Sequence, residues 1–322
     1  MPETEIFEEI IPDDWGGQRV DQCLAKLFPD YSRSRLQTWL KEGLILLDMQ
    51  QKRAKDKVLG GEKVELRVVL SSENSWEAEK IPLNIVYEDE HILVLNKSAG
   101  MVVHPAAGNF SGTMLNALLH YAPELEAIPR AGIVHRLDKE TSGLLVVART
   151  LPSQKLLVEQ LQARAFLREY DAIVNGLLTS GGTIDQPIGR HPVNRKRMAV
   201  NAKGKPAITH YRLNKRFRSH TKLTVKLETG RTHQIRVHMA HINHPIIGDP
   251  VYGGRFKAPP GSDEIFLDTL RHFKRQALHA RHLGLVHPAS QEFIEWHVEA
   301  PDDMTELENA LLLDFEKQQA DI

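Results

Sequence analysis

The segment GIVHRLDKETSGLLVVAR, from Gly132 to Arg149, most constrains what this chain can fold into. Its second half is a run of aliphatic and β-branched residues, which is typical of a buried strand. Its first half sets one carboxylate, Asp138, between Arg136 and Lys139, just before that strand. This pattern suits a solvated turn at a strand boundary, and it equally suits a catalytic carboxylate. Asp138 is therefore the first candidate site residue.

Further strand-like and helix-like segments follow from Ile81 onward. Apolar runs predict strands over HILVLNK (91–97), EYDAIVNGLL (169–178) and HTKLTVKLETG (220–230). Helical spacing of apolar residues appears in TMLNALLHYA (113–122), PSQKLLVEQLQARAF (152–166) and QIRVHMAHI (234–242). We therefore expect a mixed α/β (α+β) fold class. In it, a central mixed, mostly antiparallel sheet is flanked by helices in a large domain over residues 81–300.

Residues 16–70 form a predicted small module. RVDQCLAKLF and DYSRSRLQTWLKEG predict two helices, the second capped by Ser32 or Ser34 and stopped by Gly43. LILL and KVELRVVL predict a hairpin, which gives a two-helix-plus-hairpin arrangement. The polar residues 71–80 predict a linker between two independent cores.

The net charge of −1 conceals an uneven distribution. Residues 1–14 hold six acidic residues and no Lys or Arg, and residues 299–322 hold eight acidic residues and one lysine. By contrast, residues 186–226 hold twelve Lys or Arg and no acidic residue. Like charges repel unless a polyanion neutralises them, so this stretch favours nucleic-acid contact over a merely solvated surface. The acidic ends, including residues 301–322, are expected to be tails that aid solubility.

Several classes of protein and site are disfavoured. No apolar run reaches the roughly 20 residues of a membrane span, and the single cysteine, Cys23, fits a reducing cytoplasm. His238, His241 and His244 suggest zinc, but no carboxylate or cysteine completes the set, so no metal is expected. GNFSGT (108–113) lacks the lysine of a phosphate-binding loop, which disfavours nucleotide binding.

Five motifs in order resemble the family of ribosomal and transfer RNA pseudouridine synthases typified by the A-type enzyme. HRLDKETSGLLVVAR resembles the catalytic motif of that family. The others are NKSAGMVVHP (96–105), LETGRTHQIRVH (227–238), HPIIGDPVYGG (244–254) and RQALHA (275–280). The small module resembles the RNA-binding domain of ribosomal small-subunit protein four. The resemblance covers about residues 16–300 and is strongest to members that act on large-subunit ribosomal RNA.

The resemblance implies a role for individual residues. It makes Asp138 the catalytic aspartate, Tyr170 the active-site tyrosine that stacks on the target base and can act as a base, and Arg231 the partner of Asp138. It also implies that Arg136 enters the space left by the flipped nucleotide. Six further residues are expected to contact RNA phosphates: Ser32, Arg33, Arg35, Arg195, Lys196 and Arg197.

The implied activity is isomerisation of specific uridines in 23S ribosomal RNA or a pre-ribosomal large subunit, by a monomer that needs no cofactor. Asp138 would either attack the sugar or remove a ribose proton, and the residues do not distinguish these routes. Two alternatives stay open, which are a tRNA-directed enzyme and an inactive RNA-binding assembly factor. A glycosidase would normally need two partnered carboxylates, and only Asp138 is marked here.

Overall fold

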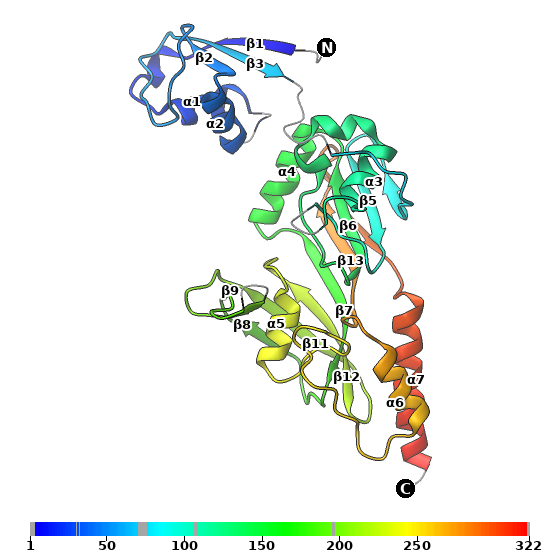
Figure 1. Cartoon of the computed structure of the whole chain (residues 1–322). Coiled ribbons are helices and arrows are strands. Elements are labelled where there is room, and N and C mark those ends of the chain that lie inside the picture. The colour runs from blue at the N-terminus through cyan, green and yellow to red at the C-terminus, as the bar shows by residue number, and fades with distance from the viewer. Residues whose placement is uncertain are drawn as a thin grey trace.

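The computed structural model describes residues 4–29, 31, 33–69, 76–105, 109–194 and 197–320. Within these ranges the chain has a small N-terminal module at one end and a large domain with its own cores (Figure 1). The elements of the small module are β1 (Thr4–Ile10), η1 (Asp13–Trp15), α1 (Val20–Leu27), α2 (Arg33–Glu42), β2 (Ile45–Leu47) and β3 (Lys63–Val69). None of the helices in these ranges combines the length and apolar character that crossing a membrane requires.

The small module packs its two helices on an antiparallel sheet with the strand order β1-β3-β2. The predicted apolar face of α2 is confirmed, because Leu36, Trp39 and Leu40 are all buried in its core. Gly43 ends that helix with a φ of +75°, a left-handed conformation that glycine adopts without strain. The helix begins at Arg33, so Ser34 lies inside it and is not its cap.

The predicted start of the module at residue 16 was wrong. All seven residues of β1 pair with β3, and Ile11 is fully buried in the module's core. Residues 4–15 therefore belong to the fold and are not a solvated tail.

The large domain contains eleven strands and five α-helices within the described residues. The strands are β4 (Ile85–Glu88), β5 (Ile92–Lys97), β6 (Ser142–Ala148), β7 (Leu167–Asn175), β8 (Gly182–Asp185), β9 (Ile188–Arg190), β10 (Met198–Val200), β11 (Ile208–Arg216), β12 (His220–Leu227), β13 (Leu278–Val286) and β14 (Phe293–His297). The helices are α3 (Met114–Tyr121), α4 (Leu151–Gln162), α5 (Gln234–His241), α6 (Glu264–His272) and α7 (Asp302–Ala320), with short 3-10 turns η2 (Pro123–Ala127) and η3 (Pro129–Gly132).

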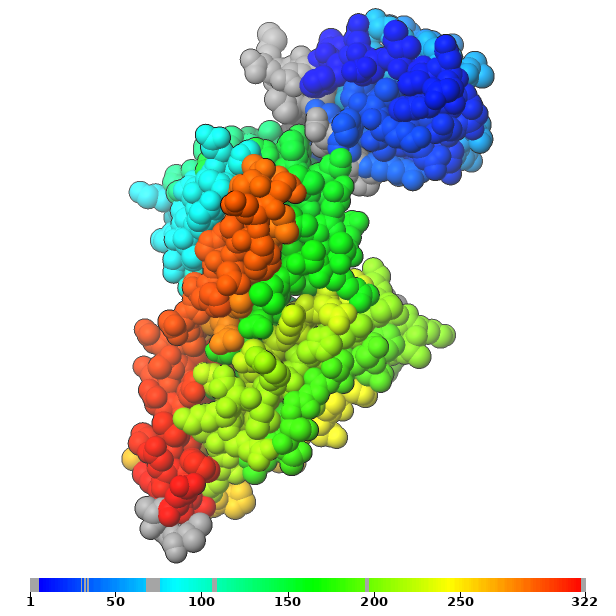
Figure 2. Space-filling view, turned by 180° about the vertical axis from the view of Figure 1, so that it is seen from behind, coloured from blue at the N-terminus to red at the C-terminus, as the bar shows by residue number. Residues whose placement is uncertain are grey.

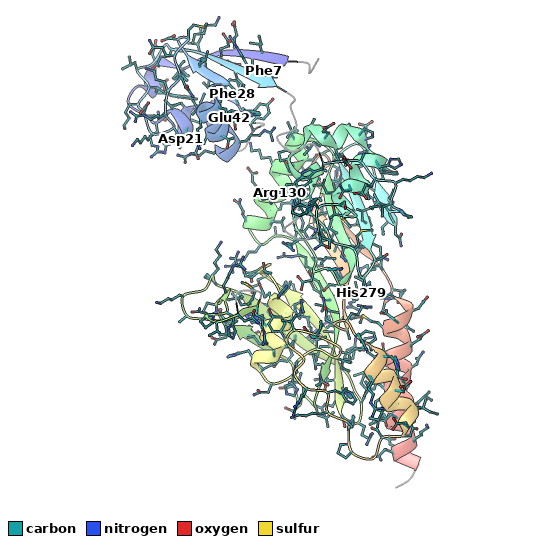
Figure 3. All side chains as sticks on the ribbon, in the orientation of Figure 1. Phe7, Asp21, Phe28, Glu42, Arg130 and His279 are labelled. Atoms are coloured by element: carbon teal, nitrogen blue, oxygen red, sulfur yellow. The ribbon has the colours of Figure 1, made fainter. Side chains whose placement is uncertain are left out.

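Nine of these strands form one sheet in the order β4-β5-β6-β13-β7-β12-β11-β8, with β14 added beside β13. All strand pairs in it are antiparallel except β13 with β6. The mixed, mostly antiparallel sheet is therefore confirmed. Figure 3 labels His279, which lies on β13 near the middle of the large domain.

Strand β6 follows the Asp138 segment and is buried on both faces. Leu145 and Val147 pack into the main core with α3, whereas Val146 packs into a second core that includes Leu157 of α4. A strand covered on both sides needs a continuous apolar run, which explains the GLLVVA sequence.

Gly143, at the start of β6, is a position that tolerates no side chain. Its φ is +113°, and an added Cβ would lie 2.2 Å from the carbonyl oxygen of Ala280 on β13. The close approach of β6 and β13 at this point holds the end of the segment that carries Asp138.

The predicted linker also ends earlier than residue 80. Trp76 packs against the main core, and the Asn116 side chain donates a hydrogen bond to the carbonyl of Glu77 at 2.8 Å. The amide of Glu79 donates to the carbonyl of Asn116 at 3.0 Å. Residues from Trp76 onward are therefore part of the large domain.

The predicted acidic C-terminal tail is a helix. Helix α7 spans 19 residues and buries Met304, Leu307 and Leu311 in the main core. Figure 2 shows this helix, in red, along the side of the large domain next to the yellow-green strands. Three of its acidic residues, Asp303, Glu308 and Asp314, pair with basic side chains of the large domain.

Candidate active site

A cavity of about 760 Å³ opens in the large domain and contains Asp138 and Tyr170 in its wall. Six arginines line it, against two acidic residues, Asp138 and Glu228. The arginines are Arg130, Arg136, Arg164, Arg168, Arg231 and Arg236. Figure 3 labels Arg130, which marks the part of the large domain where the cavity lies. An excess of positive charge in a concave site attracts a polyanion such as RNA.

The loop that carries Asp138 is anchored on both sides. The Lys97 ammonium is buried and donates to the carbonyl of Lys139 at 2.9 Å, and the amide of Thr141 donates to the carbonyl of Asp138 at 3.0 Å. The Gln276 side chain donates to the Thr141 hydroxyl at 3.1 Å. Burial lowers the pKa of Lys97 to about 7, while nearby Glu140 and Asp138 oppose that shift. These contacts hold Asp138 at a defined place in the cavity wall.

Arg236, on α5, is the cation that binds Asp138. Its Nη1 donates to Asp138 Oδ2 at 3.0 Å, and its Nε and Nη2 bind both oxygens of Asp249 at 2.7 and 2.9 Å. Burial lowers the pKa of Arg236, but the hydrogen bonds and charges of Asp249 and Asp138 outweigh burial and raise it. Burial likewise raises the pKa of Asp249, and Arg236 together with two backbone amides outweighs this and lowers it.

The predicted pairing of Arg231 with Asp138 was wrong. Arg231 lines the cavity, but its Nε donates to the carbonyl of Pro206 at 3.1 Å. A sequence signal for Arg236 existed, because it lies inside the predicted helix between the apolar residues Ile235 and Val237. A guanidinium buried within a helix needs a buried carboxylate as its partner. Arg231 lies before the helix, where its side chain has no such need.

Tyr170, on β7, is 7% exposed and lies opposite Val225 on β12. Burial raises the pKa of its phenol, the charge of Arg168 opposes this, and the charge of Asp138 adds to it. The side chain is therefore a neutral phenol at neutral pH, which can stack on a base and donate a hydrogen bond. It is poorly suited to accept a proton in that state.

The predicted RNA-contact residues lie in three places. Arg136 is exposed at the cavity, two residues before Asp138. In the small module, Arg33 pairs with the buried Asp21 at 2.8 Å, and Arg35 stacks on Trp39 at 4.7 Å from the ring centre. Figure 3 labels Asp21 in that module.

The basic stretch over residues 186–226 divides into two parts. Arg197 packs over the ring of Tyr252 at 5.2 Å, close to the cavity side of the domain. Arg218 pairs with Asp314 at 2.8 Å, and Lys222 pairs with Glu308 at 2.7 Å, both on α7. Arg218 and Lys222 are therefore neutralised by the C-terminal helix. Ser32, Arg195 and Lys196 lie outside the described residues.

Two of the three histidines that suggested zinc, His238 and His244, have protein partners. His238 is fully buried, and its ring nitrogens contact the Thr209 hydroxyl at 2.8 Å and the Gln186 carbonyl at 3.0 Å. The Nδ1 of His244 lies 2.8 Å from the carbonyl of Asn175. In the described part of the chain, His282, Glu295 and His297 form another group whose ligand atoms lie within 4.8 Å of one another. That group is on β13 and β14 and is not part of the cavity wall.

The family model described as RNA pseudouridylate synthase matches residues 91–241, which include Asp138, Tyr170 and Arg236. The chain is 54% identical to ribosomal large subunit pseudouridine synthase D of Haemophilus influenzae, over 100% of this chain and 99% of that protein. It is 55% identical to the protein of the same name from Escherichia coli, over 95% of this chain and 94% of the other.

Solved structures agree with these similarities. Human RNA pseudouridylate synthase domain containing 4 aligns with a TM-score of 0.57 and 25% identity, over 71% of this chain and 93% of its own. Human RNA pseudouridylate synthase domain containing 1 aligns with a TM-score of 0.54 and 25% identity, over 72% and 89%. The resemblance inferred from the motifs is thereby confirmed, and the chain belongs to the RNA pseudouridine synthase family.

Proposed function

We propose that this enzyme converts specific uridines of large-subunit (23S) ribosomal RNA into pseudouridines, with Asp138 as the essential group. One observation carries the assignment. An aspartate held by the Arg236–Asp249 pair stands beside a buried tyrosine in an arginine-lined cavity. The ribosomal RNA substrate is supported by relatives whose names specify the large ribosomal subunit.

The reaction rearranges one nucleotide without net oxidation or hydrolysis. The bond between N1 of uracil and C1′ of ribose breaks, the uracil turns, and C5 bonds to C1′. C5 then loses its proton, and N1 gains one, so that atoms and charge balance. The chemistry therefore requires a carboxylate at the sugar and a closed pocket that retains the free base, and it requires no cofactor.

Asp138 has the geometry for the first step. Its Oδ2 accepts a hydrogen bond from Arg236, while Oδ1 accepts no hydrogen bond from the described residues. Oδ1 is thus available either to attack C1′ or to remove a proton from the ribose. Both routes use the same oxygen, so the geometry supports Asp138 in either of them.

The nucleotide must leave its helix to reach Asp138. Flipping costs a few kcal/mol of unstacking, which phosphate contacts with the cavity arginines would offset. Arg136 stands exposed at this cavity and would occupy the vacated space. Tyr170 would stack on the flipped uracil from the cavity wall.

The small module would supply a second contact on the same RNA. The buried Asp21 fixes the guanidinium of Arg33 with Nε and Nη2 at 3.2 and 2.8 Å, which presents a rigid cation at the start of α2. We place the target in the stem-loop at the bridge between ribosomal subunits, within a pre-ribosomal large subunit. The enzyme would act there as a monomer in the cytoplasm.

The test combines Asp138→Asn with mapping of the cellular product. The variant should release no tritium from C5-labelled ribosomal RNA while binding that RNA within a few-fold of the parent enzyme. Ribosomal RNA from cells that lack the protein should lose specific pseudouridines in the large subunit. Turnover by the variant would remove Asp138 as the essential group. Loss of pseudouridines confined to tRNA would instead indicate a tRNA substrate. An inactive parent enzyme would favour an RNA-binding assembly factor.

A further inference from the structure

We propose that Tyr252 and His233 form a relay that couples the described part of the β9–β10 segment, residues 188–194 and 197–200, to the carboxylate of Asp138. Both would be positioning residues for the reaction, and this inference rests on the proposed function of Asp138. The relay runs from the amide of Met198 on β10, through the Tyr252 hydroxyl, to the imidazole of His233. That ring faces Asp138, with Nε2 3.9 Å from Oδ1.

The hydrogen-bond pattern determines which nitrogen of His233 carries the proton. The Tyr252 oxygen accepts from the amide of Met198 at 2.9 Å and lies 2.8 Å from His233 Nδ1. The phenol also has one proton to donate, and within the described residues the atom beside it that can accept this proton is His233 Nδ1. Nδ1 is therefore the acceptor, and the ring proton is on Nε2, where it faces Asp138.

The charge state of both groups agrees with this assignment. Burial lowers the pKa of His233, with the charge of Asp138 opposing that shift, so the ring is neutral at neutral pH. Burial raises the pKa of Tyr252, so its hydroxyl keeps its proton. A neutral imidazole needs one defined tautomer to present an N–H to the carboxylate, and Tyr252 defines it.

The backbone at His233 is also unusual. Its φ of 57° and ψ of 23° lie in the left-handed region, immediately before α5. A residue other than glycine rarely adopts this conformation, and such strain is concentrated at functional sites. Here the conformation directs the imidazole toward Asp138 while the next turn of helix places Arg236 on the other oxygen.

The ring of Tyr252 connects the same two regions through its faces. Arg236, the partner of Asp138, lies 5.1 Å from the ring centre, and Arg197 of the β9–β10 segment lies 5.2 Å from it. RNA bound to Arg197 would thus act on the ring of Tyr252, and Tyr252 contacts both Arg236 and His233. When RNA is bound, the β9–β10 segment would therefore align the Asp138 carboxylate, in addition to raising the affinity for RNA.

Single-turnover rates and RNA affinities of two hydroxyl deletions test the relay. Tyr252→Phe keeps the ring and removes the hydroxyl, and should slow the reaction about tenfold, the loss expected for one hydrogen bond. Its RNA affinity should stay within about twofold. Tyr87→Phe is the matched control, because its hydroxyl bonds to Asp89 on the β4 edge of the sheet, and its rate should not change.

Substitutions of His233 test the tautomer. His233→Gln keeps an N–H near the position of Nε2 and should retain far more activity than His233→Leu. Adding Tyr252→Phe to His233→Gln should cause no further loss, since glutamine has no Nδ1 to accept the phenol proton. Independent slowing by both changes would overturn the relay.

Nitrogen-15 NMR of the free enzyme gives a readout that does not depend on turnover. The His233 ring is identified as the resonance lost in His233→Gln. It should show an unprotonated Nδ1 and a protonated Nε2, and Tyr252→Phe should mix the tautomers. A protonated Nδ1 would overturn the relay. Activity of Asp138→Asn would instead refute the proposed function, while the tautomer of the free enzyme would still be measured.

Discussion

Arg236 and Asp249 face each other through two parallel hydrogen bonds of 2.7 and 2.9 Å. Asp249 also accepts the amides of Val251 and Tyr252 at 2.8 and 2.9 Å, so its carboxylate cannot rotate. The planar guanidinium is fixed in turn, and its Nη1 points at Asp138. The orientation of the Asp138 carboxylate therefore depends on an aspartate that it does not touch.

Arg236→Lys should lower the rate of pseudouridine formation by about 100-fold or more, because lysine lacks the fork that binds two carboxylates. It should also lower the free energy of unfolding by about 3 kcal/mol, since Asp249 is left buried without its full partner. Tritium release and urea unfolding measure the two effects. Arg231→Lys is the control and should cost only a few-fold in rate. A larger loss in Arg231→Lys would restore Arg231 as the partner of Asp138.

The salt dependence of RNA binding should separate the two parts of the basic stretch. Lys203 and Lys205 are exposed near β10, so each change to alanine should reduce the log–log salt slope by about 0.7 to 0.9 if that lysine contacts phosphate. Arg218 is paired with Asp314, so Arg218→Ala should leave the slope unchanged and lower stability instead. Equal slopes in all three variants would refute this division.

Acid should destabilise the protein through His135. Its Nε2 accepts the amide of Val146, and burial, with the charge of Arg168 adding to it, lowers its pKa from 6.5 to about 3. The unfolded chain therefore binds the proton more readily. The stabilising effect of the neutral ring is complete above pH 6.5 and is lost as the pH falls toward 3.

His135→Gln tests this origin, because the amide oxygen can still accept from Val146. Between pH 6 and 4 the free energy of unfolding of this variant should fall less steeply than that of the parent enzyme. The two slopes should differ by about 1.4 kcal/mol per pH unit. Urea unfolding at several pH values measures the slope. An unchanged slope would assign acid sensitivity to other groups.

Removal of residues 1–75 should leave a folded large domain that retains its chemistry and binds RNA more weakly. The two cores share no buried residue, and Asp138, Tyr170 and Arg236 all lie beyond the cut. A tethered second contact raises apparent affinity about 100-fold or more when geometry permits, so the loss should appear at low enzyme concentration. Single-turnover rates across enzyme concentrations measure this, and unchanged affinity would refute a separate RNA contact.

Removal of residues 1–80 is the matched comparison. This cut also deletes Trp76 and the backbone bonds of Glu77 and Glu79 to Asn116. The longer truncation should be less stable than the shorter one by about 2–4 kcal/mol, since Trp76 is only partly buried and loss of a fully packed aromatic residue costs about 3–5 kcal/mol. Equal stability would mean that residues 76–80 are a linker after all.

Local sequence pattern was sufficient to predict much of the secondary structure of this protein. The apolar run after Asp138 predicted β6, and the spacing of Leu36, Trp39 and Leu40 predicted the buried face of α2. Such features depend on neighbours within a few residues, since strands and helices repeat every two and 3.6 residues. The ordered motifs then identified the family and Asp138.

Tertiary contacts decided what local pattern could not. Asp138 and Arg236 are 98 residues apart, so only the packing of α5 against the β6 loop selects Arg236 over Arg231. The acidic ends resembled tails because the residues that neutralise or cover them are distant in the sequence. Glu308 and Asp314 meet Lys222 and Arg218 only after α7 docks. The charges of a segment show that it needs opposite charge nearby. The fold determines whether RNA or the chain itself supplies that charge.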